Sequence, residues 1–445
     1  MLQENQFRSV FMSLREFIEK LEAENKLVRI KKEVSTEFEI ANLLAALDGK
    51  VVLFEKVKGS EFPVVGNLVS SRDLVASALG IQKEQLLGKL AYAINNQKEP
   101  EVISGGHCQE VEEGPDLNRL PILRYMPKDG GRYIASAVCI IKDPETGTRN
   151  SSFHRLMLLD RNHFTARIVE NRGTDTALKK TGELDIAICI GNSVPVLLAG
   201  ATSLPMGVDE LGMANSMEET KLVRCKTIDV EIPADTEFVL EGRITKMTTK
   251  EGPFLDLTET YDKVREQPVI EIKRITRRKD AIFHALLPGK GEHKILMGMP
   301  REPTIFNEVS KVCRCKNVLV TPGGASWLHA VVQITKQNKD DGRKALEAAF
   351  KGHSSLKHCV VVDDDIDIYD PGEVEWAIAT RFQADKNLAV MPNQPGSSLD
   401  PSGDLTEGKK ATTCKAGFDA TIPWEKKDKG FKKERYGMVD PKNYL

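Results

Sequence analysis

The chain has 445 residues, a length that favours two or three domains. Its 63 Lys and Arg against 65 Asp and Glu give a formal net charge of -2, which excludes the global basic charge typical of nucleic-acid or anionic-membrane binding. With 40% hydrophobic and 29% charged residues, no apolar run of bilayer length and no signal-peptide pattern, we expect a globular cytoplasmic protein without a membrane span.

The first segment, residues 1–105, alternates between helix and strand. Ser13 and Glu16 form a capping box, in which each side chain satisfies the other's free backbone donor, so a helix is predicted to begin there. Apolar periodicity predicts further elements along the segment. They are strands at 27–30 and 51–55 and helices at 37–47, 71–79 and 83–96. Pro and Gly residues between 99 and 121 predict a domain boundary near residue 105.

The second segment, residues 106–305, consists mostly of short β-rich runs between turn residues, a pattern typical of a barrel or sandwich-like unit. The predicted strands are 135–142, 155–159, 164–169, 186–190, 194–199, 227–232 and 238–245. Helices are predicted at 178–183 and 213–222.

The third segment, residues 306–445, returns to α/β alternation. The predicted strands are 317–321, 330–335 and 358–362, and the predicted helices are 340–350 and 372–381. The tail from residue 384 is rich in Pro, Gly, Lys and Asp, and we expect it to wrap over a neighbour.

Several familiar motifs are absent from the sequence: GxxxxGK[ST], GxGxxG opening a helix, and GxSxG. The acidic run 363–370 lacks the central Gly and distal Glu of an EF-hand loop, so a strand end that caps the next helix is the favoured interpretation. The eight cysteines are scattered, and Cys313 and Cys315 are too close for a zinc knuckle, which favours structural thiols.

The middle of the chain carries residues suited to an anion and a divalent cation. Arg155, Arg167 and Arg172 have planar guanidinium groups that match carboxylate and phosphate oxygens. Asn150 and Glu210 offer hard oxygen ligands for Mg²⁺, Mn²⁺ or K⁺. Each residue also has a purely structural interpretation, as a turn residue, a surface ion pair or a helix start, so the residues alone indicate only a candidate site.

Two carboxylates, Glu251 and Asp256, lie on either side of a Gly-Pro turn. A partly buried pair of carboxylates can have its two pKa values driven apart, which leaves one group able to carry and donate a proton. The Gly-Pro turn is also explained as a plain turn, so this pair predicts acid–base chemistry only in combination with the basic residues.

The chain resembles the UbiD family of prenylated-flavin-dependent decarboxylases over most of its length. The motifs that carry the resemblance follow the family's order, at 150–155, 167–173, 185–210, 251–256 and 361–381. The resemblance implies an α/β (α+β) fold in three parts. These are an N-terminal α/β domain (1–105), a central split β-barrel catalytic domain that binds the flavin (106–305), and a C-terminal α/β oligomerisation domain with an extended tail (306–445).

The resemblance also implies roles for individual residues. Arg155, Glu251 and Asp256 match the family's catalytic trio, in which Arg155 orients the substrate carboxylate, Glu251 assists and Asp256 donates the proton. Asn150 and Glu210 match the ligands of a divalent metal, usually Mn²⁺, with K⁺ as a second ion. The residues that match or should line the binding site of prenylated FMN are Ser152, Phe153, His154, Arg155, Arg167, Ile168, Val169, Asn171, Arg172, Gly173, Ala201, Thr202 and Ser203.

Two residues differ from the family pattern, and Lys336 is a further candidate outside the matched motifs. Asn171 stands where many members have a metal-shell His, which puts the metal preference in doubt. Asp256 stands where some members have Glu, which shortens the reach of the acid by one methylene. Lys336, just after the strand predicted at 330–335, is a further candidate phosphate contact.

The resemblance is greatest to archaeal members, which implies decarboxylation of trans-anhydromevalonate 5-phosphate to isopentenyl phosphate in the archaeal mevalonate pathway. One alternative is decarboxylation of 4-hydroxy-3-polyprenylbenzoate in quinone synthesis. The other is a flavin-binding subunit without catalytic activity. A phosphorylated substrate needs further basic residues, and Lys336 and the cluster at 274–279 are available, although a solvated face is the favoured interpretation of that cluster. The implied partners are a flavin prenyltransferase that supplies the cofactor and further copies of the chain in a dimer or hexamer.

Overall fold

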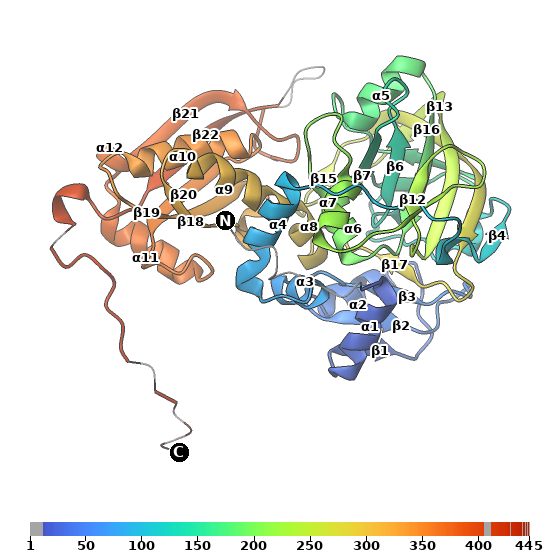
Figure 1. Ribbon diagram of the computed structural model, residues 1–445, viewed down its shortest axis with the longest axis horizontal. Helices are drawn as coiled ribbons and strands as arrows, with labels where there is room; N and C mark the ends of the chain where they lie inside the picture. Colours follow the sequence, from blue (N-terminus) through green and yellow to red (C-terminus); the bar gives the residue numbers. More distant parts are fainter. Residues whose placement is uncertain are drawn as a thin grey trace. The chain divides into compact units, whose positions relative to one another are not determined.

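The computed structural model describes residues 12–404, 411–427, 429–437, 439–440, 442 and 444 (Figure 1). It divides into two compact units, Met1–Pro300 and Arg301–Leu445. The first unit contains nearly all of the first two predicted segments, and a division of this unit at residue 105 stays a prediction. Among the described residues, no helix combines the length and the apolar character needed to cross a membrane.

The start of the first unit forms the alternating elements expected from its periodicity. The capping box is confirmed, since Glu16 N–H donates to Ser13 Oγ and the Glu16 carboxylate accepts from Ser13 N–H at 2.7 Å. These elements form a mixed sheet of strand order β1-β2-β3-β17. Its last strand, β17, comes from far along the chain. The elements are α1 (Leu14–Ala23), β1 (Leu27–Ile30), α2 (Glu39–Ala46), β2 (Val51–Phe54), β3 (Val64–Gly66), α3 (Arg72–Ala78), α4 (Leu86–Asn95) and β17 (Phe283–Ala285).

A nine-stranded sheet forms the centre of this unit and curls on itself in Figure 1. Its order is β5-β8-β9-β16-β13-β10-β6-β7, with β4 paired to β16. The strands are β4 (Val111–Glu113), β5 (Tyr133–Ile134), β6 (Val138–Lys142), β7 (Arg149–Phe153), β8 (Leu156–Leu158), β9 (His163–Ala166), β10 (Leu184–Ile190), β13 (Phe238–Glu251) and β16 (Arg265–Arg277). Alternate residues of β10 enter different cores, Ala187 and Cys189 in one, Ile186 and Ile188 in the other, so both faces of the sheet are covered.

Two predicted strands of this region differ from the structure: the strand predicted at 227–232 is confirmed only at its last two residues, and the strand predicted at 194–199 is a helix. Residues 194–199 belong to helix α6 (Val194–Ala201), which begins after Ser193 and carries Pro195 in its first turn, a position that proline favours. Every residue of α6 from Val194 to Gly200 is buried, so the sequence lacks the polar face that marks a surface helix. The other helices of this region are α5 (Gly173–Thr181), α7 (Glu210–Met217) and α8 (Gly291–Gly298). Both α5 and α7 begin and end earlier than predicted. The short strands β11 (Leu222–Arg224) and β12 (Glu231–Pro233) pair with each other.

The second unit is a five-stranded sheet of order β18-β19-β20-β22-β21 with helices on both faces. Its elements are α9 (Glu302–Ser310), β18 (Arg314–Val320), β19 (His329–Thr335), α10 (Asp341–Gly352), β20 (His358–Asp363), α11 (Pro371–Arg381), α12 (Ala384–Asn387), β21 (Leu388–Pro395) and β22 (Thr412–Asp419). Helices α9 and α10 cover one face and α11 covers the other. Part of the tail expected to wrap over a neighbour instead supplies β21 and β22 to this sheet.

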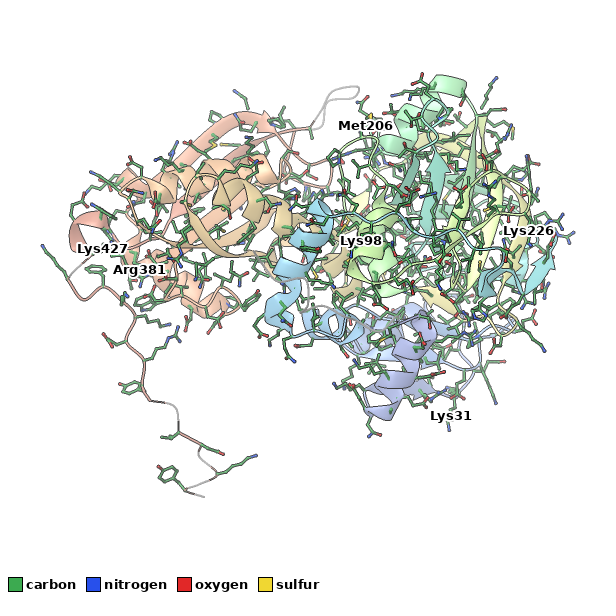
Figure 2. All side chains as sticks on the ribbon, viewed as in Figure 1. Lys31, Lys98, Met206, Lys226, Arg381 and Lys427 are labelled. Carbon is green, nitrogen blue, oxygen red and sulfur yellow. The ribbon has the colours of Figure 1, made fainter. Side chains whose placement is uncertain are left out.

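The acidic run 363–370 folds around Arg381, whose side chain is fully buried. Figure 2 labels Arg381 among the side chains of the second unit. Arg381 donates from Nη1 to Asp363 at 3.2 Å and from Nη2 to Asp365 at 2.6 Å. Asp370 caps α11 by accepting from Gly372 N–H at 2.8 Å. The run therefore acts structurally here, at a strand end and a helix cap.

Replacing Arg381 with methionine is expected to destabilise the second unit by about 3–5 kcal/mol, because two carboxylates would lose a buried partner. All three tryptophans, Trp327, Trp376 and Trp424, lie in this unit, so their fluorescence during urea unfolding measures its stability alone. Arg343→Ala is the control, since its exposed pair with Glu347 contributes below about 1 kcal/mol. Equal stability of the two variants would contradict the buried-pair interpretation.

Candidate active site

Arg155, between β7 and β8, lies at the centre of a group of three carboxylates. Its Nε and Nη2 each donate to one oxygen of Glu251 at 2.9 Å, a bidentate pair. Its Nη1 donates to Asp256 Oδ2 at 2.6 Å, and its Nη2 also donates to Asp262 Oδ2 at 2.9 Å. Glu251 ends β13, and the two aspartates follow on the hairpin of β14 (Phe254–Leu255) and β15 (Tyr261–Asp262). The structure thus brings the predicted Arg155, Glu251 and Asp256 together.

This group is nearly closed to solvent. The side chain of Glu251 is 0% exposed and that of Arg155 is 8% exposed. Tyr133 O–H donates to Glu251 Oε1 at 3.2 Å, and the guanidinium lies 4.9 Å from the centre of the Phe254 ring. Burial opposes the charged form of Arg155, but its bonds to the carboxylates outweigh burial and raise its pKa above the ordinary value. Arg155 therefore stays a cation that can bind a carboxylate.

Asp262 is a residue of this group that the sequence analysis missed. Burial would raise its pKa, but the bond from Arg265 Nη1 at 2.6 Å and the charge of Arg155 lower it below the ordinary value. No motif distinguishes Asp262 in the sequence. It reaches Arg155 because β15 pairs antiparallel with β14, where Leu255 lies opposite Tyr261. Only the register of this hairpin identifies it.

The candidate metal residues Asn150 and Glu210 also lie close together. Glu210 is the first residue of α7, and its Oε2 accepts from Ser151 N–H at 2.8 Å, directly beside Asn150 on β7. Burial raises the pKa of Glu210 to about 8. Gly173, which starts α5, approaches Asn150 so closely that a Cβ there would lie 2.0 Å from Asn150 Oδ1. Two oxygen donors and a helix N-terminus are thus assembled, a donor set that suits a hard cation and a phosphate.

The segments predicted to bind a cofactor are neighbours as well. His154 lies within 3.1 Å of Ser152 Oγ and of Thr174 Oγ1, and its Nδ1 lies 3.1 Å from Arg167 O. Burial lowers the pKa of His154 to about 4, so its ring is neutral at pH 7. Arg167 N–H donates to Arg155 O at 3.1 Å, which joins the two segments through the backbone.

The remaining predicted cofactor residues are less uniform in their surroundings. Ile168 is buried, whereas Val169 is 44% exposed. Arg172 lies directly before α5, and Asn171 has a left-handed φ of 59° with its N–H on Asp175. Phe153 packs against the end of α6, since a Cβ at Gly200 would lie 3.7 Å from its ring. Of the residues predicted as a loop, Ala201 is instead the last residue of α6, Thr202 is its C-cap and donates from Oγ1 to Leu198 O at 2.7 Å, and Ser203 follows.

The basic residues considered for a substrate phosphate have other partners. Lys336 belongs to the second unit and donates from Nζ to Thr421 Oγ1 at 2.7 Å and to Ile422 O at 3.2 Å, so its predicted phosphate contact stays a prediction. In the cluster at 274–279, Arg274 pairs with Glu112 at 2.9 Å, and Arg277 pairs with Glu113. These pairs join β16 to β4.

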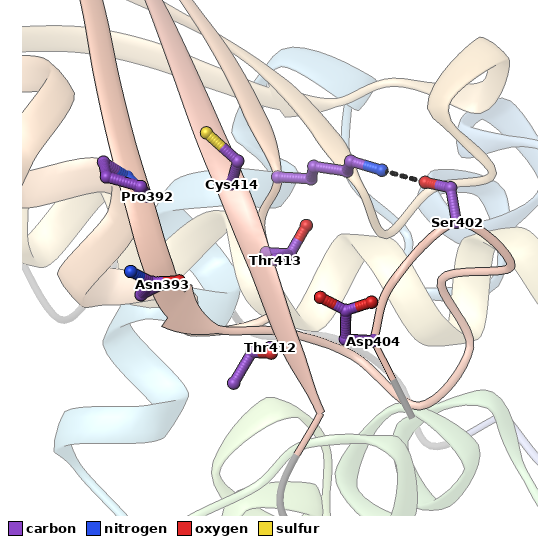
Figure 3. A pocket seen from close by; sticks show the side chains of 8 residues that line it. Pro392, Asn393, Ser402, Asp404, Thr412, Thr413 and Cys414 are labelled. Carbon is purple, nitrogen blue, oxygen red and sulfur yellow. Dashed lines mark hydrogen bonds between the residues drawn. The ribbon is translucent and has the colours of Figure 1, made fainter. Parts of the chain in front are cut away.

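Each unit contains a hollow lined mainly by polar residues. The one in the first unit has a volume of about 380 Å³ and lies beside the candidate metal residues, since Arg149 and Asp209 line it and pair with each other at 2.7 Å. The hollow in the second unit has a volume of about 320 Å³ and is lined in part by Ser402, Asp404 and Thr413 (Figure 3). Lys357, which also lines it, donates from Nζ to Ser402 Oγ. This hollow contains none of the predicted site residues.

The first unit therefore contains a buried arginine–carboxylate centre and, next to it on the curled sheet, a site with oxygen donors. Such a site suits an enzyme that binds a carboxylate and transfers a proton. Family models match nearly the whole chain. They are the N-terminal domain (residues 18–94), the Rift-related domain (101–291) and the C-terminal domain (294–420) of 3-octaprenyl-4-hydroxybenzoate carboxy-lyase, UbiD. The chain belongs to the UbiD family of carboxy-lyases and is a decarboxylase, as its motifs predict.

Relatives and solved structures agree with this assignment. The chain is 43% identical to the anhydromevalonate phosphate decarboxylase of Methanothermobacter thermautotrophicus over 92% of its own length and 97% of that protein. It is 42% identical to the enzyme of the same name from Methanosarcina mazei, over 92% and 96%. The UbiD-class enzyme HmfF from Pelotomaculum thermopropionicum, in complex with FMN, is 37% identical, with a TM-score of 0.92 over 98% of this chain and all of that one. The expected α/β architecture is thereby confirmed.

Proposed function

We propose that this decarboxylase uses prenylated FMN to convert trans-anhydromevalonate 5-phosphate into isopentenyl phosphate and carbon dioxide. The observation that supports this substrate is the sequence identity of 36% to 43% between this chain and archaeal anhydromevalonate phosphate decarboxylases, over about nine-tenths of the chain. The intact centre of Arg155, Glu251 and Asp256 supports catalysis rather than a non-catalytic subunit, because three charges kept together out of water are costly without a use.

The residues around Asn150 fit a flavin phosphate and a divalent ion. Gly173 leaves no room for a side chain beside Asn150 Oδ1, the Glu210 carboxylate is buried next to it, and the N-terminus of α5 faces this point. Within the described ranges, no three His, Cys, Asp or Glu side chains are grouped to hold a metal. Asn150 and Glu210 are the side chains that would hold Mn²⁺ here. HmfF in an evolved dimeric form is solved with prenylated FMN and is 36% identical, which supports this cofactor.

Prenylated FMN, when bound, supplies an electron sink for the carbon that loses carbon dioxide. The chain's own residues bind the acid and move the proton. Arg155 offers its Nη1 to the substrate carboxylate, which displaces Asp256 from its 2.6 Å bond and releases that side chain for proton transfer. Glu251 is buried and holds the guanidinium plane by its two bonds, so the arginine stays oriented during the exchange. We also propose that a flavin prenyltransferase supplies the cofactor and that this chain forms a dimer or a hexamer.

The experiment is decarboxylation of trans-anhydromevalonate 5-phosphate by protein loaded with prenylated FMN and Mn²⁺, with isopentenyl phosphate measured by mass spectrometry. Product formation that requires the prenylated flavin is the expected result. Protein loaded with unmodified FMN is the control. Absence of product in protein whose absorbance shows bound prenylated flavin would remove this substrate from the proposal and leave the decarboxylase assignment in place.

Replacing Gly173 with alanine is expected to weaken Mn²⁺ binding about 10- to 100-fold, the usual effect of disturbing the residues that orient a metal ligand. The new Cβ would lie 2.0 Å from Asn150 Oδ1 and must push that donor away. Binding is measured by calorimetry on the flavin-loaded protein. Gly88→Ala is the control, because a Cβ at Gly88 in α4 meets open space. Unchanged Mn²⁺ affinity in Gly173→Ala would show that Asn150 is not a ligand.

A further inference from the structure

Two lysines on α8 hold a carboxylate from the loop that carries the catalytic acid. Lys290 is the residue directly before α8, and Lys294 lies in the first turn of the helix. Their ammonium groups contact opposite oxygens of Glu259, Lys290 at 2.8 Å from Oε2 and Lys294 at 2.7 Å from Oε1. Lys290 and Lys294, called the lysine pair below, are 36% and 20% exposed. Glu259 therefore occupies a site formed by two converging positive charges.

The lysine pair lies beside the catalytic centre. Glu259 and Asp256 share one turn, in which Glu259 N–H donates to Asp256 O at 2.9 Å. Gly289, next to Lys290, packs against this turn, since a Cβ there would lie 3.0 Å from Glu259 Cγ and 3.2 Å from Asp256 O. The charges of Asp256, Arg155 and Lys294 all act on the His293 ring, whose pKa is lowered mainly by burial. The His293 ring therefore lies within electrostatic range of Asp256, Arg155 and Lys294.

Glu259 adopts a conformation that it would not keep unaided. Its φ of 59° lies in the left-handed region, which residues with a side chain rarely occupy. Such a conformation persists where surrounding contacts hold it, and it is found at sites that change state. Here the contacts are the lysine pair and the turn that includes Asp256. Loss of the lysine contacts would free Glu259 and alter the turn.

The N-terminus of α8 does not itself provide an open anion site. Gly291 N–H donates to both oxygens of Asp48 at 3.2 Å, so a carboxylate already caps this end. The positive charge available to a ligand is therefore that of the lysine pair. Two ammonium groups that converge on two oxygens suit a phosphate as well as a carboxylate, and bonds between charged groups are the stronger class of hydrogen bond.

We propose that the lysine pair binds the phosphate of the substrate and that Glu259 occupies this site until the phosphate displaces it. This inference rests on the proposed function for the identity of the substrate. The exchange couples recognition of the phosphate to the turn that carries Asp256, so an unsaturated acid without a phosphate leaves Glu259 in place. The lysine pair would thus select phosphorylated acids.

The test measures binding of inorganic phosphate by calorimetry to the full chain loaded with FMN, so that the flavin phosphate site is already filled. Lys290→Met/Lys294→Met is expected to weaken phosphate binding at least about tenfold, from the loss of two charged hydrogen bonds. Glu259→Gln is expected to tighten binding about tenfold by removing the internal competitor. Lys290→Arg/Lys294→Arg keeps both charges and should retain binding, which separates loss of charge from misfolding.

The chain offers a matched control in the second unit, where Glu308 is likewise held by two lysines, Lys311 and Lys351. Those lysines are 63% and 74% exposed, and Glu308→Gln should leave phosphate binding unchanged. Phosphate binding that is unaffected by Lys290→Met/Lys294→Met, or absent from both wild-type and Glu259→Gln protein, would overturn the inference.

Failure of this inference is distinguishable from failure of the proposed function. If wild-type protein makes isopentenyl phosphate and the methionine variant has the same KM, the lysine pair is not the phosphate site and the substrate stands. If wild-type protein with bound prenylated FMN makes no product, yet binds phosphate only through the lysine pair, the phosphate site stands and the acid is a different phosphorylated one.

Discussion

Replacing Arg155 with alanine is expected to lower kcat at least about 1,000-fold, as for other groups that stabilise charge in a site closed to water. The guanidinium contacts Glu251, Asp256 and Asp262 together, so its loss removes the carboxylate-binding group and leaves three acids facing one another. The fully buried Glu251 would lose its cation, which costs about 3–5 kcal/mol of stability. The measurements are carbon dioxide release and hydrogen exchange of β13, whose last residue is Glu251.

Arg155→Lys and Arg119→Ala test two parts of this expectation. Lysine keeps the charge, but it lacks the planar fork that reaches two oxygens of Glu251 while still bonding Asp256, so its kcat should also be low. Arg119 pairs with Glu61 and Glu113 at the surface, and its removal should leave both measurements near the wild-type values. Near-normal turnover in Arg155→Ala protein would exclude Arg155 from substrate binding.

The central residues of this site could be predicted from the sequence because they lie within short motifs. Asn150, Ser152 and Arg155 are close along one segment, and Glu251 and Asp256 flank one turn, so local sequence already places them near each other. What joins the two motifs is the strand order of the sheet, in which β10 and β6 separate β13 from β7, and β16 and β9 separate β13 from β8. Only the folded sheet brings the end of β13 to Arg155, which lies between β7 and β8. Family resemblance supplied that link, since residue spacing contains no information on strand order.

The missed residues depend on long-range register. Tyr133 reaches Glu251 from β5, and Asp262 reaches Arg155 through the β14–β15 hairpin, and neither contact follows from a motif. The wrong strand at 194–199 has a different cause. A segment buried on all sides has neither the period of 3.6 nor that of 2, so apolar content alone did not separate helix from strand.

The largest effect on chemistry with the least effect on structure is expected for Asp256→Asn. Arg155 Nη1 donates to Oδ2 of Asp256 and Leu257 N–H donates to Oδ1. Asparagine has one acceptor oxygen and can keep one of these two bonds, but its amide has no acidic proton to donate. Loss of a general acid lowers rates by about 100- to 10,000-fold, so kcat should fall in this range while flavin absorbance and Mn²⁺ affinity stay unchanged.

Asp262→Asn is the matched control, because Asp262 also accepts from Arg155, at 2.9 Å, but is shared with Arg265. It should lower kcat by less than about tenfold, the effect of weakening one hydrogen bond to a charged partner. If Asp262→Asn abolished turnover and Asp256→Asn did not, the proton donor would be Asp262. In that case Arg265, which bonds the same oxygen at 2.6 Å, would set the protonation of the acid, and Asp256 would serve only to orient Arg155.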